Sequence, residues 1–252
     1  MQLFGWPADI DASQRIGERL RGVLFDIDRT LYDNDEYAHG QITALIARFA
    51  RQFDEDPANA HRRIKEWQRT WSETNAGARQ SLGNTFASLG VPIETSVRWR
   101  EAIIEPEKHL QRDPRLRRAI EFIRTRGGRA DAPRLPLVVV TNNPVTTGRR
   151  SLAALGVDDL FDEVIGLDTT MRSKPDAAPF RAALDRVGCD AESVVCVGDR
   201  YDVDIAPALA LGIGGVLVDG VTDVYELPAL FGYGAPGNQS DHGDRPAGAT
   251  GA

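Results

Sequence analysis

Residues 23–32 of the chain read Val-Leu-Phe-Asp-Ile-Asp-Arg-Thr-Leu-Tyr. The first three form a short apolar run, which is typical of a strand buried on both faces of a parallel sheet. Asp26 and Asp28 follow at the carboxyl end of that strand, the edge at which open α/β sheets bind ligands. Two carboxylates so close together repel each other unless a cation with oxygen ligands stabilises them, and one can then act as nucleophile and the other as general acid and base. On its own, an Asp-x-Asp pair more often marks a polar turn in which the second aspartate caps the next segment.

The overall composition is that of a globular protein with an acidic balance. Of 252 residues, 42% are hydrophobic and 27% are charged. Lysine and arginine number 30 against 37 acidic residues, so the formal charge is 30 − 37 = −7. This balance argues against a general nucleic-acid binder, but it says little about small anionic substrates.

The two cysteines, Cys189 and Cys196, do not form the pattern of a disulfide framework, and a reducing cytoplasm suits them. No apolar run approaches the ~20 residues that a membrane helix needs. The first residues also lack the basic start of a signal peptide. We therefore expect a cytoplasmic protein without a membrane or nucleic-acid partner, and no pattern specifies its oligomeric state.

The segment after the first strand is expected to be entirely helical. Ile42, Leu45, Ile46 and Phe49 recur at helical spacing, and Pro57 is placed to open a second helix. Two shorter helical patterns follow at 82–89 and 94–104. No strand signal occurs from residue 33 to about residue 112. The sequence predicts an all-helical insertion over residues 33–113.

Strand and helix patterns alternate after this insertion. Asp113 is a predicted N-cap followed by proline, and it opens a helix that ends at about residue 126. Strands are expected at 137–140, 161–165, 193–197 and 215–218, and helices at 145–155, 179–187 and 205–211. This βαβ rhythm predicts an α/β fold with a doubly wound parallel sheet, formed by residues 1–32 and 114–231 and including a short helix at 13–20. The composition of residues 232–252 predicts a disordered tail.

Polar residues with related chemistry follow several of the predicted strands. The hydroxyl of Thr141, and the backbone N–H groups that follow it from Asn142 onward, could hold a phosphate oxygen. Lys174 precedes a helix and could neutralise developing charge, although a lone lysine is more often a solvated loop residue. Asp199 ends a strand after a glycine, where a functional role is favoured, whereas Asp202 is better explained as part of a helix start.

In this order, the segments resemble the motifs of the haloacid dehalogenase-like (HAD) hydrolase superfamily. These motifs are a DxDxT-type strand end, a strand ending in Ser or Thr, a lysine often followed by proline, and a GDxxxxD strand end. All four occur here with family-like spacing across residues 22–204. The core then resembles the Rossmann-like HAD fold, and the helical insertion resembles the C1 cap that many members carry.

The resemblance implies a role for each matching residue. Asp26 would attack phosphorus and form an aspartyl-phosphate, while Asp28 would protonate the leaving oxygen and then activate water. Mg²⁺ would be held by Asp26, the backbone carbonyl of Asp28 and Asp199, with Asp204 supporting the ligands. Thr141, Asn142 and Lys174 would position the phosphoryl group. Arg29 departs from the small or amide residue usual at its position, and this bears on the geometry of the substrate entrance.

The resemblance also covers other activities. Dehalogenases typically lack the second aspartate, so Asp28 favours phosphoryl transfer. A phosphonatase would need a cap lysine, and the only two, Lys65 and Lys108, lie in unpersuasive contexts. We therefore expect a Mg²⁺-dependent phosphatase that acts on a small phosphorylated metabolite. A phosphomutase, or a non-catalytic sensor or interaction protein that binds a phosphorylated ligand, remains the alternative.

Four polar residues flank breaks in the helical insertion and could line a substrate pocket, although plain caps and turns are their commoner role. They are Thr70, Asn75, Ser81 and Asn84.

Overall fold

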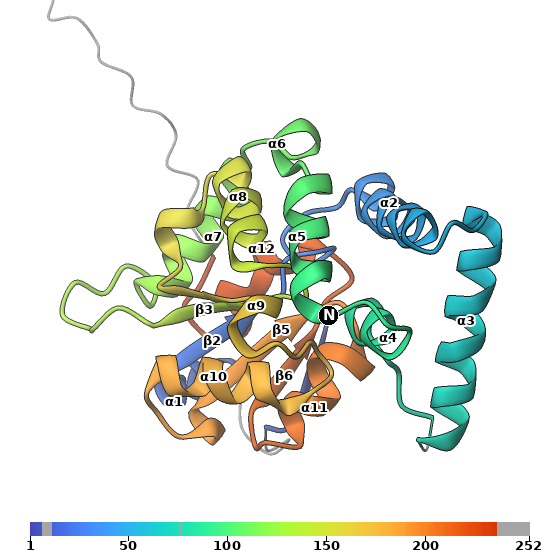
Figure 1. Cartoon of the computed structure of the whole chain (residues 1–252). Coiled ribbons are helices and arrows are strands. Elements are labelled where there is room, and N and C mark those ends of the chain that lie inside the picture. The colour runs from blue at the N-terminus through green and yellow to red at the C-terminus, as the bar shows by residue number, and fades with distance from the viewer. Residues whose placement is uncertain (7–11, 76, 236–252) are drawn as a thin grey trace, which may run out of the picture.

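Strand β2 (Gly22–Phe25) lies inside a six-stranded sheet with the order β1-β6-β5-β2-β3-β4 (Figure 1). The computed structural model describes residues 1–6, 12–75 and 77–235. β2 pairs in parallel with β3 (Leu137–Val140) and β5 (Val194–Gly198). β4 (Glu163–Ile165) and β6 (Gly214–Leu217) extend the parallel sheet. β1 (Gln2–Phe4) is antiparallel to β6 at the edge.

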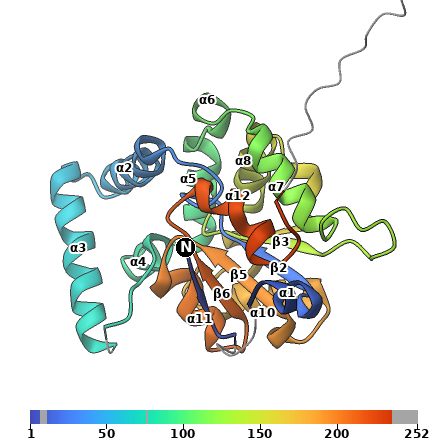
Figure 2. The same ribbon diagram turned by 180° about the vertical axis from the view of Figure 1, so that it is seen from behind.

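Helices cover both faces of the sheet (Figures 1 and 2). α1 (Ala12–Arg19), α7 (Pro114–Arg124), α8 (Val145–Leu155) and α12 (Val221–Leu230) pack on the face that carries Val23 and Phe25. α10 (Ala177–Val187) and α11 (Ala206–Leu209) cover the face that carries Leu24. Because successive side chains of a strand point to opposite faces, burial on both sides explains the continuous apolar runs. The predicted doubly wound α/β fold is confirmed.

Several elements were not predicted, among them β1 and α12. β1 is a three-residue edge strand with little burial, so it carries no strong hydrophobic pattern. α12 contains Pro228, a residue that normally argues against a helix interior. The predicted disorder of 232–252 is also wrong at its start, because the Tyr233 backbone N–H donates to the Pro228 carbonyl at 2.9 Å and its ring packs edge-on against Phe231. The rest of that predicted tail, 236–252, lies outside the described residues.

The chain between β2 and α7 forms helices and no strand in its described part. The helices are α2 (Asp35–Gln52), α3 (Pro57–Thr74), α4 (Leu82–Ser88), α5 (Ile93–Ile103) and the short α6 (Pro106–His109). Side-chain caps begin three of them: Asn34 accepts from the Tyr37 N–H, Asp56 from the Ala58 N–H, and Ser81 from the Asn84 N–H. The helical insertion predicted between the first two motifs is therefore present, and α3 lies farthest from the sheet (Figures 1 and 2).

The helical insertion has a hydrophobic cluster of its own. Phe86 stacks on Phe49 with ring centroids 4.9 Å apart, and Trp99 meets Phe86 edge-on. The insertion is also tied to the core, because Arg150 of α8 forms a bidentate pair with Glu107 of α6. Among the described residues, no helix is both long and apolar enough to cross a membrane.

We predict that Phe86→Ala destabilises the helical insertion more than the sheet. Phe86 is fully buried, so its loss should cost about 3–5 kcal/mol of local stability through the cavity that it leaves. Hydrogen exchange followed by mass spectrometry should show faster exchange in α2–α5 and little change in β2, β3 and β5. Phe53→Ala is the matched control, since Phe53 contacts the same Phe49 ring but is 39% exposed. Equal loss of protection in the sheet would contradict a separate cluster.

Candidate active site

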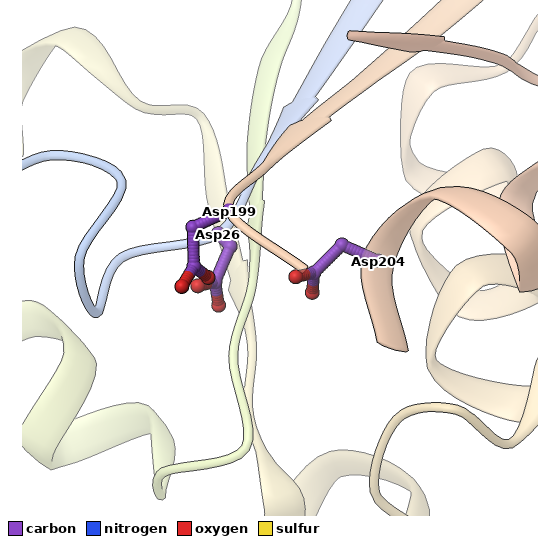
Figure 3. A group of neighbouring side chains, drawn as sticks. All are labelled: Asp26, Asp199 and Asp204. Carbon is purple, nitrogen blue, oxygen red and sulfur yellow. The ribbon is translucent and has the colours of Figure 1, made fainter. Parts of the chain in front are cut away.

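Three carboxylates meet at the carboxyl edge of the sheet. Asp26 directly follows β2, Asp199 directly follows the adjacent strand β5, and Asp204 lies in the helical turn η3 (Tyr201–Ile205). One oxygen from each lies within 4.8 Å of the others. Figure 3 shows Asp26 and Asp199 side by side, with Asp204 directed toward them from its turn. Parallel pairing of β2 with β5 brings together residues more than 170 positions apart.

Lys174 is buried between two of these carboxylates. Its Nζ donates to Asp26 Oδ1 and to Asp204 Oδ1, each at 2.6 Å, and only 1% of the residue is exposed. Asn142 holds the loop in place, because it accepts from the Lys174 N–H at 2.8 Å and donates to the Lys174 carbonyl at 3.1 Å. Lys174 is thus no solvated loop residue, and the Asn142 side chain holds the loop that carries it.

The carboxylate oxygens that receive no hydrogen bond from the protein fit a divalent cation. Asp26 Oδ2 and Asp199 Oδ1 are buried and have no hydrogen-bond partner among the described residues. Both oxygens of Asp204 are already engaged, one by Lys174 and the other by the Arg200 N–H at 3.1 Å. Buried oxygens without partners are costly, and hard cations such as Mg²⁺ take oxygen ligands. Asp26 and Asp199 are therefore the available ligands, and Asp204 orients the lysine.

The protonation of this cluster follows from its burial. Burial raises the pKa of Asp26 to about 7, with Lys174 opposing the shift and the neighbouring carboxylates adding to it. Burial also raises the pKa of Asp199. For Lys174, burial lowers the pKa, but the carboxylates of Asp204 and Asp26 outweigh it and keep the pKa above its usual value. The lysine stays charged, whereas full ionisation of Asp26 at neutral pH needs a further cation.

The glycine before Asp199 is required by close packing. A Cβ atom on Gly198 would lie 2.5 Å from the Cβ of Asp204, which no real side chain tolerates. The turn that carries Asp204 can therefore fold back on the end of β5 only if that position lacks a side chain. This contact is the physical reason for glycine beside aspartate in this motif.

Asp28 is held by three side chains that were not predicted. The Tyr32 hydroxyl and Gln41 Nε2 donate to its Oδ1 at 2.5 Å and 3.1 Å, and Asn143 Nδ2 donates to its Oδ2 at 3.0 Å. Gln41 belongs to α2, so the helical insertion contacts the second aspartate directly. The sequence offers one signal for the role of Gln41. It is a polar residue on the face of α2 that also carries the buried Leu45.

Arg29 also connects the first motif to the insertion. It has a left-handed backbone conformation, with φ of 62°, and its Nε lies 3.1 Å from Asp35 Oδ1 at the start of α2. The same nitrogen lies 4.0 Å from Asp199 Oδ2. Its guanidinium therefore stands between the entrance to the helical insertion and the proposed cation ligands.

The other residues predicted for the site divide into two groups. Thr141 is buried, and its Oγ1 accepts from the Asn143 N–H at 3.2 Å, so it shapes the turn after β3. Ser81 and Asn84 both hydrogen-bond to the Ser173 hydroxyl, next to Lys174. Two others, Thr70 and Asn75, are not brought to the site. They are exposed at the end of α3, where the Asn75 side chain donates to the Trp71 carbonyl and the residue ends the helix.

A cleft of about 780 Å³ separates the helical insertion from the core. Apolar side chains from α2 and α3 form one wall, including Ile42 and Ile64. Its charged lining residues are all basic and contain no carboxylate: Lys65, Arg79, Lys174 and Arg200. Carboxylates outside the lining pair with two of these cations, Lys174 with Asp26 and Asp204 and Arg79 with Asp202, so the lining supplies basic hydrogen-bond donors rather than a large net positive charge.

Comparisons with known proteins place this arrangement in a family. Phosphoglycolate phosphatase of Pectobacterium atrosepticum is 28% identical over 203 residues, covering 75% of this chain and 76% of that protein. Glyceraldehyde 3-phosphate phosphatase of Methanothermobacter thermautotrophicus is 26% identical over 212 residues, covering 79% and 86%. A HAD phosphatase from Thermococcus onnurineus superposes with a TM-score of 0.53 at 22% identity, covering 79% and 86%, a likeness that shows the fold alone.

A family model described as haloacid dehalogenase-like hydrolase matches residues 20–212, more than half of the chain. That range contains β2–β5, the helical insertion and every carboxylate of the cluster. The chain belongs to the haloacid dehalogenase-like hydrolase family.

Proposed function

We propose that this protein is a Mg²⁺-dependent phosphatase that hydrolyses a small phosphorylated metabolite through an aspartyl-phosphate. One observation carries the proposal. Lys174 bridges Asp26 and Asp204 at 2.6 Å, while Asp26 Oδ2 and Asp199 Oδ1 are buried without a hydrogen-bond partner in the described chain. This geometry supports a carboxylate nucleophile beside a lysine, with two oxygens left over for a cation.

In the first step, the Asp26 carboxylate attacks phosphorus and the bond from phosphorus to the leaving oxygen breaks. A Mg²⁺ ion held by Asp26, Asp199 and the Asp28 carbonyl would screen the repulsion between carboxylate and phosphate. Lys174 neutralises part of the charge on the same group. Asp28 gives its proton to the leaving oxygen, so the alcohol departs neutral.

In the second step, water attacks phosphorus of the aspartyl-phosphate. Asp28, now a carboxylate, takes a proton from that water, and the bond between phosphorus and the Asp26 oxygen breaks. Inorganic phosphate and the original carboxylate are released. Tyr32, Gln41 and Asn143 keep Asp28 aimed at the reacting oxygens in both steps.

The helical insertion, residues 33–113, is proposed to act as a cap that selects the leaving group. Its α2 and α3 form one wall of the cleft, and Gln41 reaches the general acid. The cleft volume of about 780 Å³ falls in the range of small-molecule sites, and its basic side chains can donate hydrogen bonds to a phosphate ester. The names of the relatives, which refer to phosphoglycolate and glyceraldehyde 3-phosphate, support a short-chain substrate.

Replacing the nucleophile tests the mechanism. We predict that Asp26→Asn lowers turnover of p-nitrophenyl phosphate in Mg²⁺ by at least about 10³-fold, because the amide cannot form the aspartyl-phosphate. Asp202→Asn is the matched control, since Asp202 lies in the neighbouring turn and pairs with Arg79, and it should retain activity. An active Asp26→Asn variant would reject the mechanism. A wild-type protein that hydrolyses no ester in a broad panel would instead favour a phospho-ligand sensor.

The raised pKa of Asp26 predicts a pH-dependent stability in chelator. Its carboxyl has an ordinary value of 3.8, and burial raises the folded-state pKa to about 7. The folded protein then holds this proton more tightly than the unfolded chain. The stabilising contribution is fully present below about pH 4, and it is lost as the pH rises through about 7.

Urea unfolding in EDTA at pH 5 and pH 8 measures this effect. We expect wild type to lose stability relative to Asp26→Asn on going to pH 8, by an amount on the order of a few kcal/mol. Adding Mg²⁺ at pH 8 should restore much of the wild-type stability and little of the variant's, because the cation favours the carboxylate. An identical difference between wild type and variant at both pH values would contradict the prediction.

The cleft also predicts poor activity on macromolecules. We expect phosphoglycolate or glyceraldehyde 3-phosphate to be hydrolysed with a kcat/KM at least about 10²-fold above that of a phosphoserine peptide, because the cleft has the size of a small-molecule site. Release of inorganic phosphate from each substrate, measured side by side at one Mg²⁺ concentration, decides this. Faster turnover of the peptide would mean that the insertion leaves the site open.

A further inference from the structure

Arg29 has no part in the proposed mechanism, although it directly follows the general acid Asp28. It lies in a tight turn closed by the Leu31 N–H, which donates to the Ile27 carbonyl at 2.9 Å. Its φ of 62° is left-handed, a conformation that glycine and asparagine adopt more readily than arginine. A small or amide residue would fit this turn with less strain, which points to a role for the guanidinium itself.

Two carboxylates share this guanidinium. The Arg29 Nε lies 3.1 Å from Asp35 Oδ1 and 4.0 Å from Asp199 Oδ2. The longer distance exceeds that of a hydrogen bond, so Asp199 is held only by the attraction of opposite charges. The Asp199 side chain is 11% exposed, whereas that of Asp35 is 69% exposed. Arg29 thus connects a nearly buried ligand of the proposed cation site with an acid at the surface of the helical insertion.

Asp35 belongs to the segment through which the chain enters the insertion. Three consecutive side chains fix this segment, each through a different partner. Asp33 accepts from the Val221 N–H at 2.9 Å, and Asn34 donates to the His109 carbonyl at 3.1 Å. Asp35, the first residue of α2, is the member that pairs with the first motif. A change in the partners of Asp35 therefore acts on the segment that directs α2 away from the core.

A divalent cation would compete with Arg29 for Asp199. A Mg²⁺ ion held by this carboxylate and a guanidinium beside the same carboxylate repel each other. Water screens that repulsion only in part, because Asp199 is nearly buried. Arg29 can reduce the repulsion by turning toward Asp35, since half of its side chain is exposed and Asp35 already lies at 3.1 Å.

We propose that Arg29 shifts from Asp199 to Asp35 when Mg²⁺ binds, so that this arginine sets the Mg²⁺ affinity and couples the cation site to the start of the insertion. The inference rests on the Mg²⁺ site of the proposed function and adds a residue that regulates it. Arg29 lowers the affinity by competing for Asp199. Asp35 raises it by drawing the guanidinium away, so changes at the two residues act in opposite directions.

Calorimetric titration with MgCl2 alone, without substrate, tests this exchange of partners. We expect Arg29→Asn to bind Mg²⁺ about 3- to 10-fold more tightly than wild type, because a competing charge is removed. Asp35→Asn should bind Mg²⁺ about 2- to 5-fold more weakly, because the guanidinium then turns to Asp199. In the double variant, Asp35→Asn should add little, since no arginine is left to redirect. Additive effects of the two substitutions would overturn the proposal.

Two further variants separate the charge of Arg29 from other effects. Arg29→Lys keeps a positive charge in the same turn, and its Mg²⁺ affinity should stay closer to that of wild type than to that of Arg29→Asn. Arg79→Asn is the matched control, because Arg79 pairs with Asp202 in the adjacent turn at 2.8 Å, and it should change the affinity little. Equal tightening in Arg29→Lys would assign the effect to the backbone, and equal tightening in Arg79→Asn would assign it to net charge. Either result would overturn the proposal.

Hydrogen exchange followed by mass spectrometry tests the coupling to the insertion. Saturating MgCl2 should slow exchange at the start of α2, from the capped Tyr37 N–H onward, more in wild type than in Arg29→Asn. The same Mg²⁺ effect in both proteins would overturn the coupling. A wild type that binds Mg²⁺ while none of these differences appears would reject this inference and leave the phosphatase proposal standing. A wild type that binds no Mg²⁺ would reject the cation site of the proposed function and this inference with it.

Discussion

The salt bridges of Lys174 with Asp26 and Asp204 are the interaction on which the rest of the site depends. A buried lysine and two buried carboxylates are each costly to desolvate, and they are tolerated because each is the partner of another. Three separate segments must meet for this to happen: the end of β2, the turn after β5, and the loop before α10. The doubly wound sheet supplies that meeting point, and Asn142 and Gly198 adjust it by holding the lysine loop and admitting the aspartate turn.

The helical insertion completes the site from the other side. Gln41 donates to Asp28, Arg29 pairs with Asp35 at the start of α2, and Ser81 meets Ser173 beside the lysine. These contacts connect the insertion to the first and third motifs rather than to the surface of the core alone. The division of labour proposed above follows from this arrangement: the sheet edge carries the groups that meet phosphate, and the insertion carries those that meet the leaving group.

Much of the fold was readable from local patterns. Runs such as Leu137–Val140 are apolar throughout because both faces of the sheet are covered, and the helical spacing of Leu45 and Phe49 reflects a shared buried face. The patterns failed where local signals are weak. β1 is too short and too exposed to show an alternation of apolar and polar residues, and α12 contains Pro228. Tyr233 lies among polar and small residues, yet it packs on the core.

By itself, the sequence determined the fold class, the helical insertion and the family, because chemistry at strand ends is encoded in consecutive residues. Only the tertiary structure decided which side chains, distant in the sequence, form hydrogen bonds with one another. It occupied Asn142 with the lysine loop, left Thr70 and Asn75 at an exposed helix end, and brought Gln41 and Asn143 to Asp28. The Asn143–Asp28 hydrogen bond joins residues 115 positions apart and the Lys174–Asp26 bond residues 148 apart, and such contacts depend on how the elements pack, which a linear pattern does not specify.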